Sequence, residues 1–403
     1  PPGKRGFYTS FIQITATAGL MISLVVILGV RFAVGEEAFL DWGWRIPFLV
    51  SILMLGVSLL IRLKLAESPA FQKMKAEGKG STTPLKDSFG KWPNLKLVLI
   101  ALMGLAAGQA VVWYTGQFYA LFFLERVLKV DGPLANIMMA AALLLATPFF
   151  VFWGWLSDKI GRKPIILGGC LIAALTYFPL FHALTGAANP QLAAANASSP
   201  VAVYADPADC SFQFDPIGKT TFSKSCDLAK SYLAKAGVTY ENVAAPAGTV
   251  AEVRIGSTVV PSFRGEAMPA AEFKDAKKTW ETGLAGSLKT AGYPAKADSA
   301  LVNKPLTIAI LFTLVFYVTM VYGPIAAALV EMFPTNIRYT SMSLPYHIGN
   351  GWFGGFLPTT AFAMVAATGN IYYGLWYPIL IAVITAVVGF LLVKEGKDVD
   401  IHT

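Results

Sequence analysis

Long apolar stretches alternate with short polar segments along most of the chain. Eight stretches are predominantly apolar: residues 6–34, 46–61, 97–124, 133–155, 164–187, 306–330, 342–367 and 372–393. About 20 helical residues, each rising about 1.5 Å, cross the hydrocarbon core of a bilayer. The pattern therefore predicts an all-α membrane protein with eight transmembrane helices.

Residues 188–304 interrupt this pattern. They are rich in Ala, Ser, Pro and Gly, carry charges of both signs, and hold no stretch apolar enough to span a bilayer. Strand-like runs occur at 250–255 and 258–260, and an Ala- and Lys-rich run at 270–280 favours a helix. We expect these residues to form a compact insert on the extracytoplasmic side.

Basic residues gather in the connecting segments 1–5, 62–96, 158–163, 336–338 and 394–397, all on one side of the predicted bundle. By the positive-inside rule that side is the cytoplasm, so both chain ends are expected there and the insert is expected outside. Because these loops account for the net charge of +8, no nucleic-acid partner is indicated. We expect a multi-pass monomer in the lipid bilayer of the bacterial inner membrane.

The composition excludes an ordinary soluble domain. Hydrophobic residues make up 55% of the chain and charged residues only 14%, against about a quarter in soluble domains. Three cysteines and three histidines share no metal-ligand spacing, so we expect no metal and no cofactor. Cys210 and Cys226 both lie in the insert, where an external compartment allows a disulfide between them; two free thiols are the alternative.

The most specific charged segment joins the apolar stretches 133–155 and 164–187. It begins at Gly154 and carries Asp158, Lys159, Gly161, Arg162 and Lys163. Asp158 can pair with Arg162 across a bend that Gly161 allows, or lie against the positive N-terminal end of a neighbouring helix. The alternative is a tight basic turn that only sets the topology.

A short pattern occurs twice, each time just before a predicted span on the cytoplasmic side. Pro-x-x-x-Arg-x-x-x-x-Ser begins at Pro1 and again at Pro334. Parallel halves joined by a long basic linker are typical of a large transporter class. The expected organisation is two helices that end a first half (1–66), a linker (67–96), three helices of a second half (97–187), the insert (188–304), and three last helices with a tail (305–403).

The turn at 154–163 resembles the signature G-x-x-x-D-(R/K)-x-G-R-(R/K) of the major facilitator superfamily. Segments 44–48, 67–71 and 331–338 resemble its metabolite:proton symporter branch, whose members carry organic acids, shikimate-like compounds or proline and betaine. The resemblance implies that the chain corresponds to helices 5–12 of a twelve-helix bundle, as an N-terminally truncated, internal fragment. The insert departs from the short loop usual in the family.

The resemblance also implies a cytoplasmic gate. Its expected residues are Gly154, Asp158, Lys159, Gly161, Arg162, Lys163, Glu331, Pro334, Arg338 and Arg5. The helix after Arg338 is expected beside Asp158, with Glu331 completing a cluster of charges. Arg5 stands in the repeat where Arg338 stands, but its own Asp-bearing turn is not in this chain, so we expect Arg5 to lack its partner.

Polar side chains within the spans are candidates for substrate contact, because buried polarity is costly in lipid. Gln109, Trp113 and Gln117 follow each other at helical spacing, with Tyr114 beside them; further candidates are Tyr317, His347 and Asn350. Hydrogen bonding between helices is the alternative for each. His347 is the one titratable candidate in the membrane, and we expect the main proton carrier in the helices before this chain.

These observations predict a secondary transporter that moves a small polar metabolite by alternating access, with proton symport. The expected partners are the small-molecule substrate and protons. A drug or metabolite efflux antiporter of the same fold is the alternative, and a membrane sensor that uses the insert is a further one. An enzyme is not expected, because the chain has no G-x-S-x-G or H-E-x-x-H motif.

Overall fold

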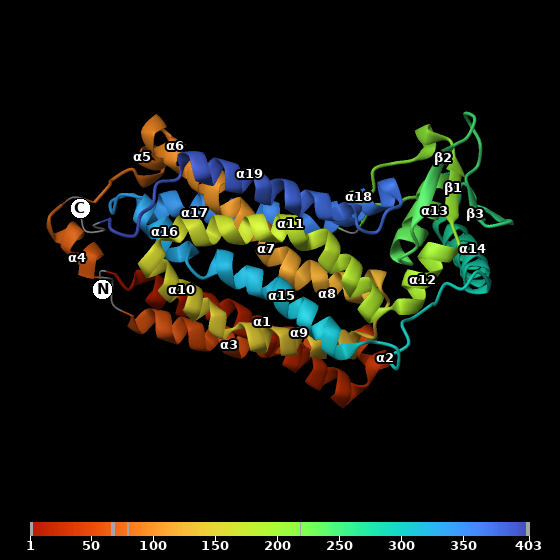
Figure 1. Cartoon of the computed structure of the whole chain (residues 1–403), viewed down its shortest axis with the longest axis horizontal. Coiled ribbons are helices and arrows are strands. Elements are labelled where there is room, and N and C mark those ends of the chain that lie inside the picture. The colour runs from red at the N-terminus through yellow and green to blue at the C-terminus, as the bar shows by residue number, and fades with distance from the viewer. Residues whose placement is uncertain (1–2, 66–68, 79, 218, 400–403) are drawn as a thin grey trace.

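A computed structural model describes residues 3–65, 69–78, 80–217 and 219–399. It shows a long helical bundle with a small α/β unit at one end (Figure 1). We call the end near Arg5 and Lys394 the terminal end, and the end that carries residues 188–304 the insert end. Pro1 and Glu67, which belong to predicted sequence motifs, lie outside the described residues.

Two membrane helices come first, and short helices connect them to the rest. Their bounds are α1 (Arg5–Val34), α2 (Glu36–Ala38), α3 (Arg45–Lys64), α4 (Pro69–Ala76) and α5 (Pro84–Phe89). A π-helical turn, Phe39–Gly43, lies between α2 and α3. No residue of α3 is buried, and its apolar side chains are exposed on every face, which suits a helix surrounded by lipid.

The next helices form the larger part of the bundle. The first is continuous through α6 (Trp92–Ala101), α7 (Ala107–Tyr114) and α8 (Ala120–Phe122), with π-helical turns η2 (Leu102–Ala106), η3 (Thr115–Tyr119) and η4 (Phe123–Val127). It is followed by α9 (Gly132–Ala146), α10 (Pro148–Ile160), α11 (Arg162–Ala188), α15 (Lys304–Tyr322) and α16 (Ile325–Met332). The last segments are α17 (Arg338–Ile348), η6 (Gly349–Gly354), α18 (Leu357–Thr368), η7 (Tyr373–Leu375) and α19 (Trp376–Leu392).

Seven helices of the described chain are long and apolar enough to cross a membrane, where the sequence predicted eight. The difference is the predicted span 342–367, which is divided into α17, η6 and α18 with a break at Gly355 and Phe356. These pieces still follow one another from the terminal end to the insert end (Figure 1). Pro358 in the first turn of α18 cannot donate a backbone hydrogen bond, which explains why the helix restarts there.

The insert contains a four-stranded mixed sheet with helices beside it. Its elements are α12 (Pro190–Ser198), β1 (Val201–Ala205), η5 (Pro207–Asp209), α13 (Ser225–Lys235), β2 (Tyr240–Ala244), β3 (Glu252–Ile255), β4 (Thr258–Pro261) and α14 (Ala270–Thr290). The strand order is β2-β1-β3-β4, with β1 parallel to β2 and the other pairs antiparallel. A disulfide joins Cys210 to Cys226 at the start of α13.

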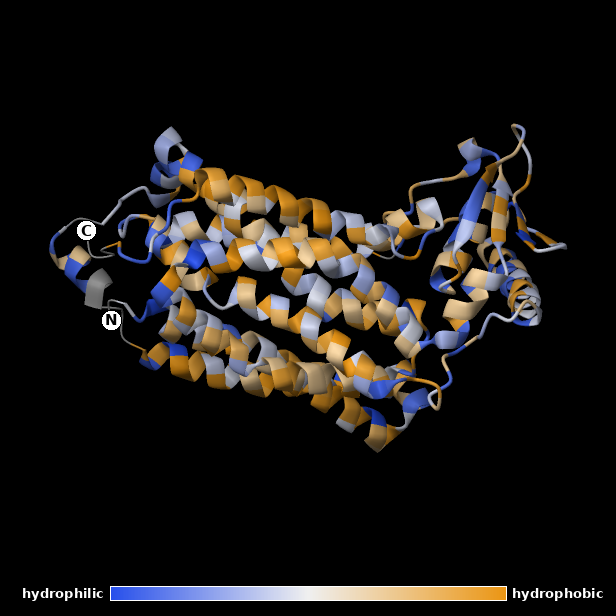
Figure 2. Cartoon of the chain, viewed as in Figure 1, coloured by the Kyte–Doolittle hydropathy of each residue, from blue (hydrophilic) through white to orange (hydrophobic). Residues whose placement is uncertain are grey.

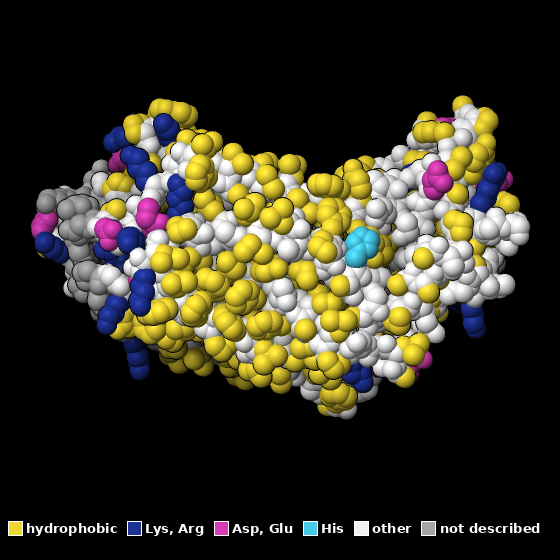
Figure 3. All heavy atoms as spheres, in the orientation of Figure 1, with side chains coloured by type: hydrophobic (Ala, Val, Ile, Leu, Met, Phe, Trp, Pro, Cys, Tyr) yellow, Lys and Arg dark blue, Asp and Glu magenta, His cyan; other side chains and the backbone are white. Residues whose placement is uncertain are grey.

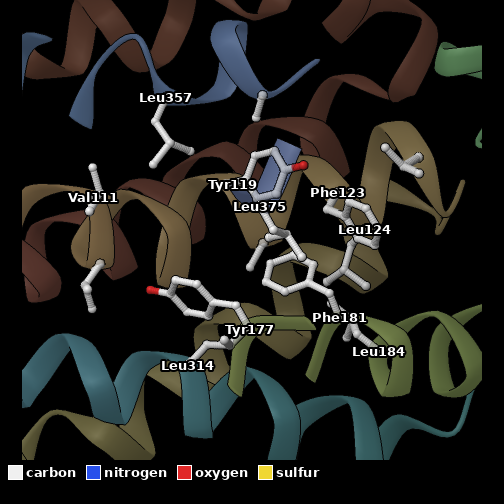
Figure 4. Packing of buried hydrophobic residues seen from close by; sticks show 14 of the residues in the cluster. Val111, Tyr119, Phe123, Leu124, Tyr177, Phe181, Leu184, Leu314, Leu357 and Leu375 are labelled. Atoms are coloured by element: carbon white, nitrogen blue, oxygen red, sulfur yellow. The ribbon is translucent and has the colours of Figure 1, made fainter. Parts of the chain in front are cut away.

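Apolar side chains cover the middle of the bundle, and charged ones lie at its two ends (Figures 2 and 3). This distribution is the one expected for helices that lie across a bilayer. Inside the bundle, large side chains from several helices pack together, among them Tyr119, Phe123 and Phe181 (Figure 4). The ring centres of Phe123 and Phe181 are 5.1 Å apart, so this part of the second half is tightly packed.

Candidate functional site

Asp158, near the end of α10, is bound to the beginning of α1. Its two carboxylate oxygens accept hydrogen bonds from the backbone N–H groups of Gly6 and Phe7, each at 2.8 Å. The first N–H groups of a helix have no partner within the helix, and the helix dipole makes this end positive. Asp158 therefore caps α1 and ties it to α10. It also pairs with Arg162 at 2.8 Å, which is the pair expected from the sequence.

Two glycines allow this approach of α1 to α10. A Cβ atom on Gly6 would lie 2.4 Å from the carbonyl oxygen of Gly154, and one on Gly154 would lie 2.5 Å from that of Gly6. Both distances are too short for any side chain, so the two backbones meet directly. The first position of the signature turn thus requires glycine because α1 packs against it.

Glu331 lies between two arginines. Arg162 donates to both of its carboxylate oxygens, from Nε at 3.3 Å and from Nη2 at 3.0 Å, and Arg5 donates from Nη1 at 3.2 Å. The Glu331 side chain is fully buried and that of Arg162 is 3% exposed. We call Arg5, Asp158, Arg162 and Glu331 the charged cluster. Removing one partner from such a buried network leaves an uncompensated charge, at a cost of about 3–5 kcal/mol.

The expected neighbour of this turn was wrong. Asp158 caps α1, not the helix after Arg338, and Arg5 has a partner in Glu331. The repeat relates the segment at Arg5 to the segment at Arg338, but it does not tell which of the two lies beside the turn. In the structure it is the helix that starts at Arg5. The Nε atom of Arg338 donates to the carbonyl of Phe333, within its own loop.

The C-terminal tail also takes part in the turn, which the sequence did not indicate. Glu395 accepts hydrogen bonds from the backbone N–H groups of Arg162 and Lys163, each at 3.0 Å, and so caps α11. The Lys163 ammonium in turn donates to two carbonyls at the end of α19. Gly161, which lies between α10 and α11, has a φ of +104°, in the range that favours glycine.

The remaining residues of the expected gate have local roles. The Lys159 ammonium lies 3.9 Å from the centre of the Trp155 ring, and its backbone carbonyl accepts from Lys397. Pro334 shapes the loop before α17, where its carbonyl accepts the N–H of Ile337. Neither residue contacts the charged cluster.

A second group of side chains lies deeper in the bundle, on α7, α15, α17 and η6. Gln109 donates from Nε2 to Oδ1 of Asn350 at 3.4 Å, and the hydroxyls of Tyr322 and Tyr346 are 2.8 Å apart. The Trp113 ring lies 6.0 Å from that of Tyr322. We call these five residues the polar–aromatic cluster. Tyr322 and Tyr346 were not predicted, although Tyr322 directly precedes the glycine and proline at 323–324.

Three buried atoms in and beside this cluster have no hydrogen-bond partner among the described residues: Gln109 Oε1, Trp113 Nε1 and Gln117 Oε1. Leaving a buried polar atom unsatisfied costs about 1–3 kcal/mol, so such atoms in a native fold need an explanation. The Gln117 amide nitrogen lies 3.5 Å from the hydroxyl of Thr17 on α1. Gln117 thus lies beside α1, whereas Gln109 bonds to Asn350.

The other substrate candidates have different surroundings. Tyr317 lies between α11 and α15, where its hydroxyl accepts from Thr176 at 3.2 Å, as the alternative of interhelical bonding expected. Tyr114 packs against Gly354, where a Cβ atom would lie 2.3 Å from the ring. His347 is exposed on α17, next to Tyr346. Among the described residues, no three or more His, Cys, Asp or Glu side chains are grouped so that they could hold a metal ion.

Comparisons with known proteins identify the family of the chain. The family model described as Major Facilitator Superfamily matches residues 1–205, and the model described as Sugar (and other) transporter matches residues 283–402. Neither match includes residues 206–282, which lie within the insert. No solved structure matches the chain significantly.

Curated relatives include the alpha-ketoglutarate permease of Escherichia coli (strain K12), 30% identical over 191 residues, which cover 47% of this chain and 43% of the relative. The shikimate transporter of the same strain is 30% identical, with coverage of 46% and 42%. The proline/betaine transporter of Salmonella typhimurium (strain LT2) is 30% identical, with coverage of 45% and 37%. The chain spans less than half the length of these relatives. It is an integral, multi-pass membrane protein, and it belongs to the major facilitator superfamily.

Proposed function

We propose that the complete transporter moves a small polar metabolite, of organic-acid or proline and betaine type, by alternating access coupled to proton symport. The observation that carries this proposal is the charged cluster, because it joins the first-half helix α1 to the second-half turn through contacts that can be broken. The similarity to an alpha-ketoglutarate permease, a shikimate transporter and a proline/betaine transporter supports a small polar substrate.

The charged cluster divides into bonds between the halves and bonds within one half. Asp158 to Gly6 and Phe7, and Arg5 to Glu331, connect α1 with the second half. The pairs that Arg162 makes with Asp158 and Glu331 lie within the second half. When α1 moves away, Arg162 stays paired with both carboxylates, so neither is left without a cation, and the cluster then carries one net negative charge. This division suits a gate that opens and closes repeatedly.

The polar–aromatic cluster is the proposed substrate site. The Gln109 side chain offers an acceptor and the Trp113 ring offers a donor, each buried and without another partner among the described residues. Asn350 and Tyr346 add further polar groups from the opposite helices. His347, three residues before Asn350, is the proposed proton-binding group near this cluster.

The proposed orientation puts the terminal end in the cytoplasm and the insert outside the bacterial inner membrane, because basic residues gather at the terminal end. We propose that the transporter acts as a monomer. We also propose that the chain is organised as two helices of a first half, a linker, and a second half with an insert.

Uptake by the complete transporter in proteoliposomes tests the proposed function. Labelled alpha-ketoglutarate, shikimate and proline are supplied with an inwardly directed proton gradient, and we expect one of them to accumulate and the interior to acidify. Gln109→Ala should lower uptake at least tenfold, whereas Tyr317→Phe should change it less than twofold, because that hydroxyl bonds to Thr176. Extrusion of hydrophobic cations without uptake of these metabolites would establish the efflux alternative instead.

A further inference from the structure

A cavity of about 580 Å³ lies between the insert and the insert end of the bundle. Its walls come from the end of η4 and the segment after it, the loop that follows the first strand of the insert, α13, and α18. In Figure 1 these parts of the insert lie beyond the end of α18. The cavity lies at the insert end of the bundle, whereas the charged cluster lies at the terminal end. It shares no residue with the polar–aromatic cluster.

The charges around this cavity are unbalanced. Arg126, Lys129 and Lys235 line it, and the one carboxylate among its described lining residues is Asp215, which accepts a backbone hydrogen bond from Thr220. No ion pair to any of the three cations is found within the described ranges. Burial, and then the nearby charges of Arg126 and Lys235, lower the pKa of Lys129. An anion placed between these groups would remove their mutual repulsion.

Lys129 is held in an unusual backbone conformation. With a φ of 57°, it is the one non-glycine residue of positive φ in the described chain. Its carbonyl accepts the N–H of Ala297, which fixes the loop from the other side of the insert. A neighbouring cavity of about 410 Å³ is also lined by Lys129 and Lys235. Backbone strain of this kind concentrates at ligand sites, where it holds a side chain in place.

The remaining walls are apolar or carry hydroxyl groups. Phe362, Ala363 and Ala366 form one face of α18, and Phe222 faces them from the insert loop, while hydroxyls come from Ser231 and two threonines. The geometry of this wall is fixed, because the Tyr240 side chain and backbone bond to the last carbonyls of α18. The cavity therefore offers cations at one part and hydrocarbon at another.

We propose that this cavity binds a small organic anion, with a carboxylate or phosphate group at Lys129 and Lys235 and a short apolar body against α18. The site is separate from the proposed transport path. The anion can come from two sources, a free metabolite or the headgroup of an anionic lipid, and both present the same charged oxygens.

Binding to the full chain tests the proposal. Calorimetry in detergent with alpha-ketoglutarate as the probe gives the affinity for a free anion, and native mass spectrometry after exposure to phosphatidylglycerol or phosphatidylcholine gives lipid retention. Lys129→Gln with Lys235→Gln should weaken binding of one anionic probe at least tenfold. The control pair Lys278→Gln with Lys296→Gln removes the same charge from exposed positions of the insert and should change binding less than twofold. A Gln109→Ala background separates this site from the proposed transport site.

Lys129→Gly provides a variant whose fold is not at risk, since glycine tolerates the positive φ. It should also weaken binding, by about three- to tenfold. Loss of alpha-ketoglutarate binding would identify a metabolite site, and selective loss of phosphatidylglycerol would identify a lipid site. Equal binding of both probes by the double variant and its control pair, or no binding of either probe to the unmodified chain, would overturn the proposal.

Discussion

The two ends of the bundle use charge in opposite ways. At the terminal end, Arg5, Asp158, Arg162 and Glu331 are paired with one another and largely buried. At the insert end, Lys129 and the two cations beside it surround a cavity, with no ion pair among the described residues. Paired charges hold parts of a protein together, whereas three cations that line a cavity with one carboxylate, Asp215, and with Glu281 near Lys235 are suited to receiving an anion.

The packing also differs between the two ends. At the terminal end, two glycines bring α1 and α10 into backbone contact, so the joint closes without side chains between the helices. At the insert end, a separate folded unit is attached to the end of α18 through hydrogen bonds from Tyr240 and Asn242. The contact between α1 and α10 can separate along one helix interface, whereas hydrogen bonds fix the insert to α18.

Removing the disulfide tests whether the insert is a unit distinct from the bundle, and it has the largest expected effect. Cys210→Ser with Cys226→Ser opens a connection between residues 16 positions apart. The chain-entropy argument gives a loss of about 3 kcal/mol in the free energy of unfolding the insert. Limited proteolysis should then cleave residues 206–282 much faster while the membrane helices stay protected. Unchanged cleavage would show that the bundle, and not the disulfide, keeps the insert folded.

Filling the glycine contact tests the closed joint at the terminal end. Gly154→Ala places a methyl group against Gly6, and such overpacking costs about 1–3 kcal/mol. Closure should become roughly five- to a hundredfold less favourable, because each 1.4 kcal/mol is a factor of ten. The rate of substrate uptake by the complete transporter is the measurement. Gly168→Ala, where nothing lies within 4 Å of the new methyl group, is the matched control and should leave uptake unchanged.

The tail contact should give the smallest effect. Glu395→Gln keeps an acceptor for the N–H of Arg162, leaves the exposed N–H of Lys163 to water, and removes the charge at the N-terminus of α11. Such a charge is worth about 0.3–1 kcal/mol, so uptake should fall by no more than about fivefold. Asp398→Asn, an exposed acid of the same tail, should have no effect. If both variants behave alike, the tail has no part in the joint.

Features set by the local sequence could be predicted, whereas features set by packing between distant segments could not. The spans were predictable because each apolar stretch is long. The pair of Asp158 with Arg162 was predictable because Gly161 allows a bend between them. The division of 342–367 was missed, because hydropathy does not report π-helical turns. Which helix Asp158 would cap was also missed, since that depends on how two halves pack. The positive φ of Lys129 carries no sequence signal, because lysine rarely adopts it.

Hydrogen exchange at Gly6 and Phe7 tests most directly whether Asp158 holds α1 to α10. These amides lie in the first turn of α1, where no intrahelical bond protects them, so their protection depends on the Asp158 carboxylate. In the complete transporter we expect slow exchange at both amides. Asp158→Asn should raise the exchange rate at both amides at least tenfold and slow substrate transport. Fast exchange in the unmodified protein, or equal exchange in the variant, would contradict the account.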